Sequence, residues 1–163
     1  MPEAEIKLDN LSKCLEEAYL LYFNTRKDIK LNLIKPENDI YFHFDTLQIS
    51  RCFGNLIKNA IEAVEKIPNP AVEVLMATDA KNIKIEIKDN GVGIDEKMLS
   101  KIFEPYFTTK TKGTGLGLSI VKRIIEDHGG KIKIEKNKNM AGTTSLINFC
   151  LLYTSDAADD LVC

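Results

Sequence analysis

Apolar residues recur every three or four positions in three stretches of the chain. This spacing is typical of amphipathic helices, and it predicts them over residues 10–23, 45–66 and 116–128. Asp9 or Asn10 is suited to cap the first helix, because a short polar side chain can accept a hydrogen bond from a backbone N–H that the helix leaves free. A proline-containing segment follows the second helix and a pair of glycines follows the third, and both signals end a helix.

In other stretches apolar and polar residues alternate, which is the pattern of half-buried strands. Residues 81–89 are the clearest case, because their isoleucines face one way and their charged residues the other. The remaining predicted strands are 29–34, 39–45, 71–78, 131–137 and 143–149. We expect the first two of these to form a hairpin beneath the first helix, and the last two to form an antiparallel pair with its turn near residues 137–142.

The order of these elements predicts the fold class. It is α/β (α+β), a two-layer sandwich in which the helices pack on one face of a mixed, mostly antiparallel sheet. The 163 residues suit one domain, which we place at residues 1–149. Residues 150–163 do not continue the pattern, and we expect a non-native or disordered tail there.

The composition narrows the class of protein. A net charge of -2 gives no basic surface for nucleic acid, and no apolar run approaches the roughly 20 residues of a membrane helix. The four cysteines form neither a CxxC pair nor a Cys/His cluster, so we expect reduced thiols rather than a metal site or a disulfide framework. We therefore expect a cytoplasmic domain that contacts neither nucleic acid nor membrane, while a membrane anchor elsewhere in a longer parent protein stays open.

Two asparagines lie on one face of the second predicted helix. Asn55 and Asn59 are four positions apart, so both amides project beside the apolar stripe. A carboxamide oxygen suits a Mg²⁺ ion that keeps several waters and binds mainly through phosphate oxygens. Taken alone, such a pair is more often a solvated surface feature.

A carboxylate followed by two glycines ends the strand 81–89. Asp89 could accept a hydrogen bond from the exocyclic amine of adenine, whereas guanine would present a carbonyl oxygen to it. Gly91 and Gly93 leave room for a sharp turn and for close approach of the backbone to a base. Taken alone, the pattern indicates an ordinary turn.

A basic, glycine-rich segment leads into the third predicted helix. Gly113, Gly115 and Gly117 free backbone N–H groups to face an anion, and the start of a helix adds partial positive charge. Lys110 adds a full charge nearby. The spacing matches neither a P-loop nor a dinucleotide-binding fingerprint.

Together these motifs resemble the ATP-binding catalytic domain of two-component sensor histidine kinases. NLIKNAIEA resembles the asparagine box, DNGVGI the first glycine box, FEPYFTTK the phenylalanine box, and GTGLGLSIVKRIIEDHGGKI the second glycine box with its helix. The resemblance covers roughly residues 5–149 and is nearest to nitrogen-regulation kinases of the NtrY and NtrB type. It implies the Bergerat-type fold of the GHKL ATPases.

The resemblance also implies roles for individual residues. Asn59 would hold Mg²⁺ with the assistance of Asn55, and Lys110 in a short lid could reach the phosphates. Asp89 would read adenine, with Thr143 supporting the base through water. The nucleotide-binding residues that it implies are Asn59, Asp89, Gly91, Gly93, Phe107, Gly113, Thr114, Gly115, Leu116, Gly117, Leu118 and Thr143.

The phospho-acceptor is not evident in this chain. His43 lies in a predicted strand and His128 precedes two glycines at a helix end, and neither has the acidic helical setting of an acceptor histidine. We expect a dimerisation domain upstream in a parent kinase to carry it, and a response regulator to be the next partner. Glu62 and Ser145 depart from the family pattern, which commonly has lysine and phenylalanine there.

Other functions on the same fold are left open. A GHKL-type ATPase would use a glutamate where this chain has Asn55, because an amide cannot act as a general base. A non-catalytic nucleotide-sensing module is the second alternative. A serine kinase or anti-sigma factor is the third, and the phenylalanine box counts against it.

Overall fold

A computed structural model of the chain describes residues 3–107 and 117–151. The helices are α1 (Leu11–Phe23), α2 (Thr46–Val64), α3 (Glu96–Leu99) and α4 (Gly117–Asp127). The strands are β1 (Lys7–Asn10), β2 (Lys30–Ile34), β3 (Tyr41–Phe44), β4 (Ala71–Thr78), β5 (Asn82–Asp89), β6 (Lys131–Lys136) and β7 (Thr143–Cys150).

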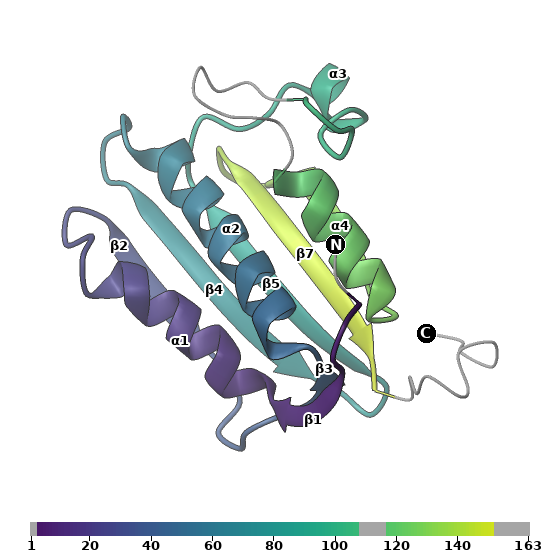
Figure 1. Cartoon of the computed structure of the whole chain (residues 1–163). Helices are drawn as coiled ribbons and strands as arrows, with labels where there is room; N and C mark the ends of the chain where they lie inside the picture. Colours follow the sequence, from purple (N-terminus) through teal and green to yellow (C-terminus); the bar gives the residue numbers. More distant parts are fainter. Residues whose placement is uncertain (1–2, 108–116, 152–163) are drawn as a thin grey trace.

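The main sheet has five strands in the order β2-β4-β5-β7-β6. Only β2 and β4 pair in parallel, and the other neighbours are antiparallel. Helices α1, α2 and α4 lie on one face of this sheet (Figure 1). The predicted two-layer sandwich is therefore confirmed.

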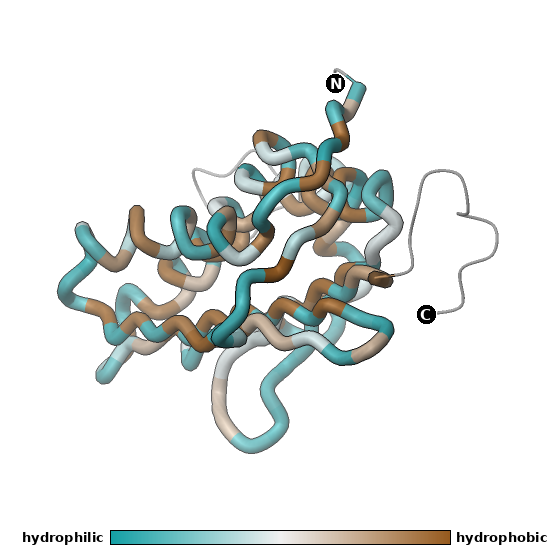
Figure 2. The backbone as a smooth tube through the Cα atoms, turned by 90° about the horizontal axis from the view of Figure 1, so that it is seen from below, coloured by the Kyte–Doolittle hydropathy of each residue, from teal (hydrophilic) through white to brown (hydrophobic). Residues whose placement is uncertain are grey.

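The core lies between the two layers. On β5 the three alternating isoleucines Ile83, Ile85 and Ile87 are buried, as their spacing predicts. Helix α2 buries an apolar stripe against them that includes Phe53 and Ile57. Figure 2 shows the sheet with the helices gathered on one side of it, and the apolar positions alternate along the strands.

The predicted hairpin of residues 29–34 and 39–45 is wrong. The two strands form, but β2 pairs with β4, and β3 pairs with β1 in a separate two-stranded sheet. Alternation shows which side chains of a strand are buried, such as Phe42 and Phe44 of β3. It does not show which neighbour completes the backbone hydrogen bonds.

The last strand runs one residue past the predicted domain boundary at 149. Cys150 is buried and pairs with Asn82, and the backbone N–H of Leu151 donates to the oxygen of Lys81 at 2.7 Å. The rest of the predicted tail, residues 152–163, lies outside the described residues. Cys14 and Cys52 are free thiols, whereas Cys150 is disulfide-bonded, so the expectation of reduced thiols is wrong for Cys150.

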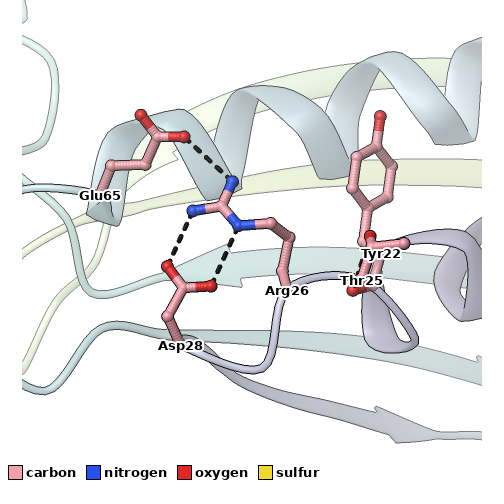
Figure 3. Close-up of polar contacts among 5 residues, drawn as sticks. All are labelled: Tyr22, Thr25, Arg26, Asp28 and Glu65. Carbon is pink, nitrogen blue, oxygen red and sulfur yellow. Dashed lines mark hydrogen bonds and ion pairs between the residues drawn. The ribbon is translucent and has the colours of Figure 1, made fainter.

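Arg26 links the turn after α1 to the end of α2 (Figure 3). Its guanidinium contacts the Asp28 carboxylate at 2.9 Å and the Glu65 carboxylate at 3.1 Å. Glu65 directly follows the last turn of α2, so Arg26 links the end of that helix to Asp28, which lies just before β2. The same helix carries the asparagine pair of the predicted site.

Candidate functional site

The predicted motifs meet at one end of the sandwich. Helix α2 ends there, α4 and β7 begin there, and β5 ends there (Figure 1). Asp89 and Thr143 contact each other there, and Gly91 packs against Ala63 in the last turn of α2. Asn55 lies midway along the same helix, against the start of α4.

The two asparagines of α2 contact each other. The Asn59 Nδ2 group donates to Asn55 Oδ1 at 3.1 Å in a half-buried setting. The first residue of α4 lies directly against this pair, because a Cβ on Gly117 would stand 2.8 Å from Asn55 Nδ2. A glycine at that position thus lets the start of α4 reach the asparagines.

Asp89 is the buried carboxylate at the end of β5. Only 5 % of its surface is exposed, and its Oδ1 atom accepts hydrogen bonds from the backbone N–H groups of Gly91 (2.9 Å) and Thr143 (3.3 Å). Burial raises the pKa of the Asp89 carboxyl, and these two hydrogen bonds oppose part of that rise. A carboxylate held in this way can accept a further hydrogen bond from a ligand.

The glycines after Asp89 fit the loop against α2. A Cβ on Gly91 would stand 2.7 Å from the carbonyl carbon of Ala63, and the Val92 N–H donates to the Ala63 oxygen at 3.4 Å. Gly93 has φ +78°, a conformation that other residues rarely adopt. The predicted need for small residues in this loop therefore has a steric cause at Gly91 and a conformational one at Gly93.

Two predicted residues of the described part have other contacts. Phe107 is half-buried, and its N–H donates to the Glu104 oxygen at 3.2 Å. Leu118 packs against the hydrophobic core from α4. The remaining predicted residues, Lys110, Gly113, Thr114, Gly115 and Leu116, lie outside the described residues.

Sequence reasoning missed three residues that shape the surroundings of Asp89. Asn90 binds the segment before β4, with its Oδ1 accepting from the Ala71 N–H and its Nδ2 donating to the Asn69 oxygen. Gly142 and Asn137 contact the Asp89 backbone from the turn between β6 and β7. Of these three residues, only Gly142 gave a signal in the sequence, because a glycine often marks a position that another segment approaches closely.

Neither histidine has the setting of a phospho-acceptor. His128 is fully buried, its Nε2 accepts from the Asp45 N–H at 3.0 Å, and its Nδ1 lies 2.7 Å from the Ile124 oxygen. These partners require a neutral ring with the proton on Nδ1, and they occupy both nitrogens. His128 is therefore structural. His43 is exposed, but it lies on strand β3 rather than on a helix.

Within residues 3–107 and 117–151, no group of three or more His, Cys, Asp or Glu side chains could hold a metal ion. In that same part of the chain, no helix is both long enough and apolar enough to cross a membrane.

Known proteins share this arrangement. The family described as histidine kinase-, DNA gyrase B-, and HSP90-like ATPase matches residues 44–154. The chain belongs to this family. The proteins to which this chain is similar are sensor kinases of the histidine kinase branch of the family. This confirms the resemblance that the four motifs indicated.

Among curated proteins, the chain is 40% identical over 143 residues to sporulation kinase A of Bacillus subtilis (strain 168), covering 86% of this chain and 23% of that protein. It is 41% identical over 110 residues to the putative sensor histidine kinase NtrY-like of Rickettsia bellii (strain RML369-C), covering 68% of this chain and 18% of that protein. The chain thus spans less than a quarter of these relatives, and the second supports the nitrogen-regulation subgroup.

Among solved structures, the chain is similar to the catalytic domain of histidine kinase ThkA, with a TM-score of 0.80, 33% identity, and coverage of 90% of this chain and 96% of that chain. A structure of ThkA in complex with the response regulator protein TrrA matches with a TM-score of 0.76 at 28% identity, covering 90% of this chain and 42% of that chain.

Proposed function

We propose that this domain binds ATP with Mg²⁺ and transfers the γ-phosphate to a histidine on a dimerisation domain of its parent sensor kinase. The observation that carries the proposal is the buried carboxylate of Asp89, held by two backbone N–H groups. The loop that follows it packs against Ala63 of α2, the helix that carries Asn55 and Asn59. No ion pair joins this carboxylate to a cation among residues 3–107 and 117–151, and a buried carboxylate of this kind is a candidate functional group.

The Asp89 carboxylate selects the base in this proposal. Its Oδ1 already accepts two backbone hydrogen bonds, which fix the plane of the carboxylate. The exocyclic amine of adenine donates to it, whereas the carbonyl oxygen of guanine is repelled. Thr143 supports the base through water, and Gly91 and Gly93 let the backbone approach it.

Asn59, assisted by Asn55, is the proposed ligand for Mg²⁺. The donor set fits this ion, because a neutral amide beside another amide suits a cation that binds mainly through phosphate oxygens and water. When bound, Mg²⁺ neutralises charge on the phosphates. Leu116, Gly117, Leu118 and the lid residues Phe107, Lys110, Gly113, Thr114 and Gly115 are the proposed contacts to the rest of the nucleotide.

This chain's own groups favour transfer to a delivered nucleophile over hydrolysis. Asn55 stands where hydrolytic relatives carry a glutamate, and an amide cannot take a proton from water. The contribution of Asn55 and Asn59 is then to orient, because phosphoryl transfer depends mainly on positioning and charge stabilisation. His128 is committed to structural hydrogen bonds and His43 lies on strand β3, so we assign the acceptor histidine to the dimerisation domain.

The proposed partners are the histidine-bearing dimerisation domain and a response regulator. The similarity of this chain to ThkA, which has been solved in complex with the response regulator protein TrrA, supports a response regulator as the second partner. We assign the catalytic domain to residues 1–149, with β7 continuing to Cys150, and regard residues 152–163 as a tail. A cytoplasmic location follows from the need for ATP and a response regulator.

Transfer in trans tests the proposal. The chain is mixed with radiolabelled ATP, Mg²⁺ and the separately produced dimerisation domain of the NtrY-like relative. We expect label on that domain, loss of label when its acceptor histidine is replaced by glutamine, and loss with the Asp89→Asn chain. Rapid release of phosphate without any acceptor would contradict the proposal and favour the GHKL-type ATPase instead.

A further inference from the structure

Asn137 lies in the turn between β6 and β7, and its side chain makes three hydrogen bonds. Nδ2 donates to the main-chain oxygens of Asp89 (2.8 Å) and Ala141 (3.0 Å), and Oδ1 accepts from the Thr144 hydroxyl (2.6 Å). Two carbonyl oxygens can only be faced by the nitrogen of the amide, so these partners fix its orientation. One side chain thereby connects the turn to a residue 48 positions away.

The carbonyl that Asn137 binds lies just beyond the end of a ladder. On the β7 side, the last pair of the β5–β7 register is Lys88 with Thr144, so Asp89 is one residue past it. Gly142 is pressed against the same peptide group, and a Cβ there would stand 2.8 Å from the Asp89 carbonyl carbon. Beyond this last pair, contacts from the turn hold the Asp89 backbone where ladder hydrogen bonds to β7 have ended.

The same turn also contacts the Asp89 side chain. Thr143, which follows Gly142, donates its N–H to Asp89 Oδ1 at 3.3 Å. A displacement of the turn would consequently move both the peptide group and the carboxylate of Asp89.

Apolar packing contributes little to the contact between this turn and the glycine loop, which is the segment of residues 91–95 after β5. A cleft of about 590 Å³ lies between them, lined by residues 92–95 of the loop and by residues 136, 137 and 140–142 of the turn. Of the large apolar residues that line it, Val92 and Met140 are 79% and 45% exposed, and Ile94 is half-buried. The hydrogen bonds of Asn137 are thus a main connection between the turn and the end of β5.

We propose that Asn137 is a positioning residue that acts through Asp89 and sets the preference of the site for adenine. The inference rests on the proposed function, because it assumes that the Asp89 carboxylate meets the base. Removal of the Nδ2 donors leaves the Asp89 carbonyl without this partner. It also loosens the turn whose Thr143 N–H holds the carboxylate, so that the carboxylate can shift. We expect roughly tenfold weaker ATP binding, the effect of one lost buried hydrogen bond.

The test compares Asn137→Asp with Asn139→Asp in the full chain. The first change keeps the shape and the acceptor for Thr144 but removes both donors, and the second places the same charge on an exposed residue of the same turn. Binding of ATP and of inosine triphosphate is measured by calorimetry with Mg²⁺. The second ligand carries a carbonyl oxygen in place of the exocyclic amine.

For Asn137→Asp we expect ATP to bind roughly tenfold more weakly with little change for inosine triphosphate, so that the preference for ATP falls. Asn139→Asp should keep both affinities. In an Asp89→Asn background, Asn137→Asp should add no further loss, because the group through which it acts is gone. Equal losses for the two ligands, or an unchanged preference, would overturn the proposal.

Thr144→Val provides a second variant if Asn137→Asp does not fold. It removes the hydroxyl that fixes the amide and should lower the preference for ATP in the same direction. Wild-type binding separates the two levels of inference. A folded wild type that ignores ATP defeats the proposed function and this inference with it, whereas a selective wild type with unaffected variants defeats this inference alone.

Discussion

Asp89 combines two properties that oppose each other in the unliganded protein. Its carboxylate is suited to a donor on a ligand, yet burial makes the ionised form costly before that ligand arrives. Functional residues commonly carry such a cost, because the ligand relieves it. At this scale the sequence was informative, since an aspartate at a strand end followed by spaced glycines could be recognised without coordinates.

The stability of the unliganded protein should reflect the raised pKa of Asp89. Because the folded-state pKa lies above the unfolded one, the stabilising contribution of this group is present at low pH and is lost as the pH rises through the folded-state pKa. Asp89→Asn removes this dependence and retains an oxygen for the two N–H donors. We expect the variant to gain stability relative to wild type between about pH 4 and pH 7.

Urea unfolding of both proteins at the two pH values measures this difference. Asp127→Asn, on an exposed residue of α4, controls for the change in charge alone. A stability difference between Asp89→Asn and wild type that stays constant with pH would contradict the assignment of Asp89.

The two free thiols should be inert in the folded protein. Burial raises the pKa of both Cys14 and Cys52 to about 12, so almost no reactive thiolate is present at pH 8. We expect neither to react with an aromatic disulfide reagent until the chain is unfolded. Rapid modification of Cys52 in the native protein, located by mass spectrometry, would show that α2 is less well packed than the structure indicates.

The helices and strands differ in how well their own residues predict them. Helix α2 and strand β5 were predictable, because one apolar face on each gives a clear period. Strand β1 was missed because Lys7–Asn10 has no apolar alternation, and α3 because it has one short turn. The partners of β2 and β3 were predicted wrongly, and the contact of Asn137 with Asp89 was not foreseen, since both depend on segments that are distant along the chain.

A pair of glycine substitutions tests how the elements fit together. A Cβ on Gly54, inside α2, would meet nothing within 4 Å, so Gly54→Ala should raise the free energy of unfolding by about 1 kcal/mol through helix propensity. A Cβ on Gly91 would collide with the Ala63 backbone. Gly91→Ala should therefore destabilise the protein by about 1–3 kcal/mol and weaken nucleotide binding.

Urea unfolding with circular dichroism measures both substitutions. The prediction concerns their opposite signs, because the chemical change is the same. Equal effects would contradict the close approach of the glycine loop to α2.

At the scale of the whole molecule, the sandwich brings separate motifs to one end. The asparagine pair lies on α2, the buried carboxylate of Asp89 ends β5, Thr143 starts β7, and Gly117 starts α4. Each motif alone had an ordinary structural explanation, but their convergence makes a nucleotide-binding site the better explanation. The order of the motifs along the chain predicted this convergence, whereas the supporting contacts of Asn90, Asn137 and Gly142 required the fold.

Calorimetry of ATP binding with Mg²⁺ is the decisive test of this nucleotide site, with wild type, Asp89→Asn and Asn59→Ala measured beside each other. We predict that wild type binds ATP and ignores GTP, that Asp89→Asn loses at least roughly tenfold in affinity, and that Asn59→Ala loses the dependence on Mg²⁺. A folded wild type that binds no ATP, or that binds ATP and GTP equally in all three proteins, would contradict a site in which Asp89 reads adenine.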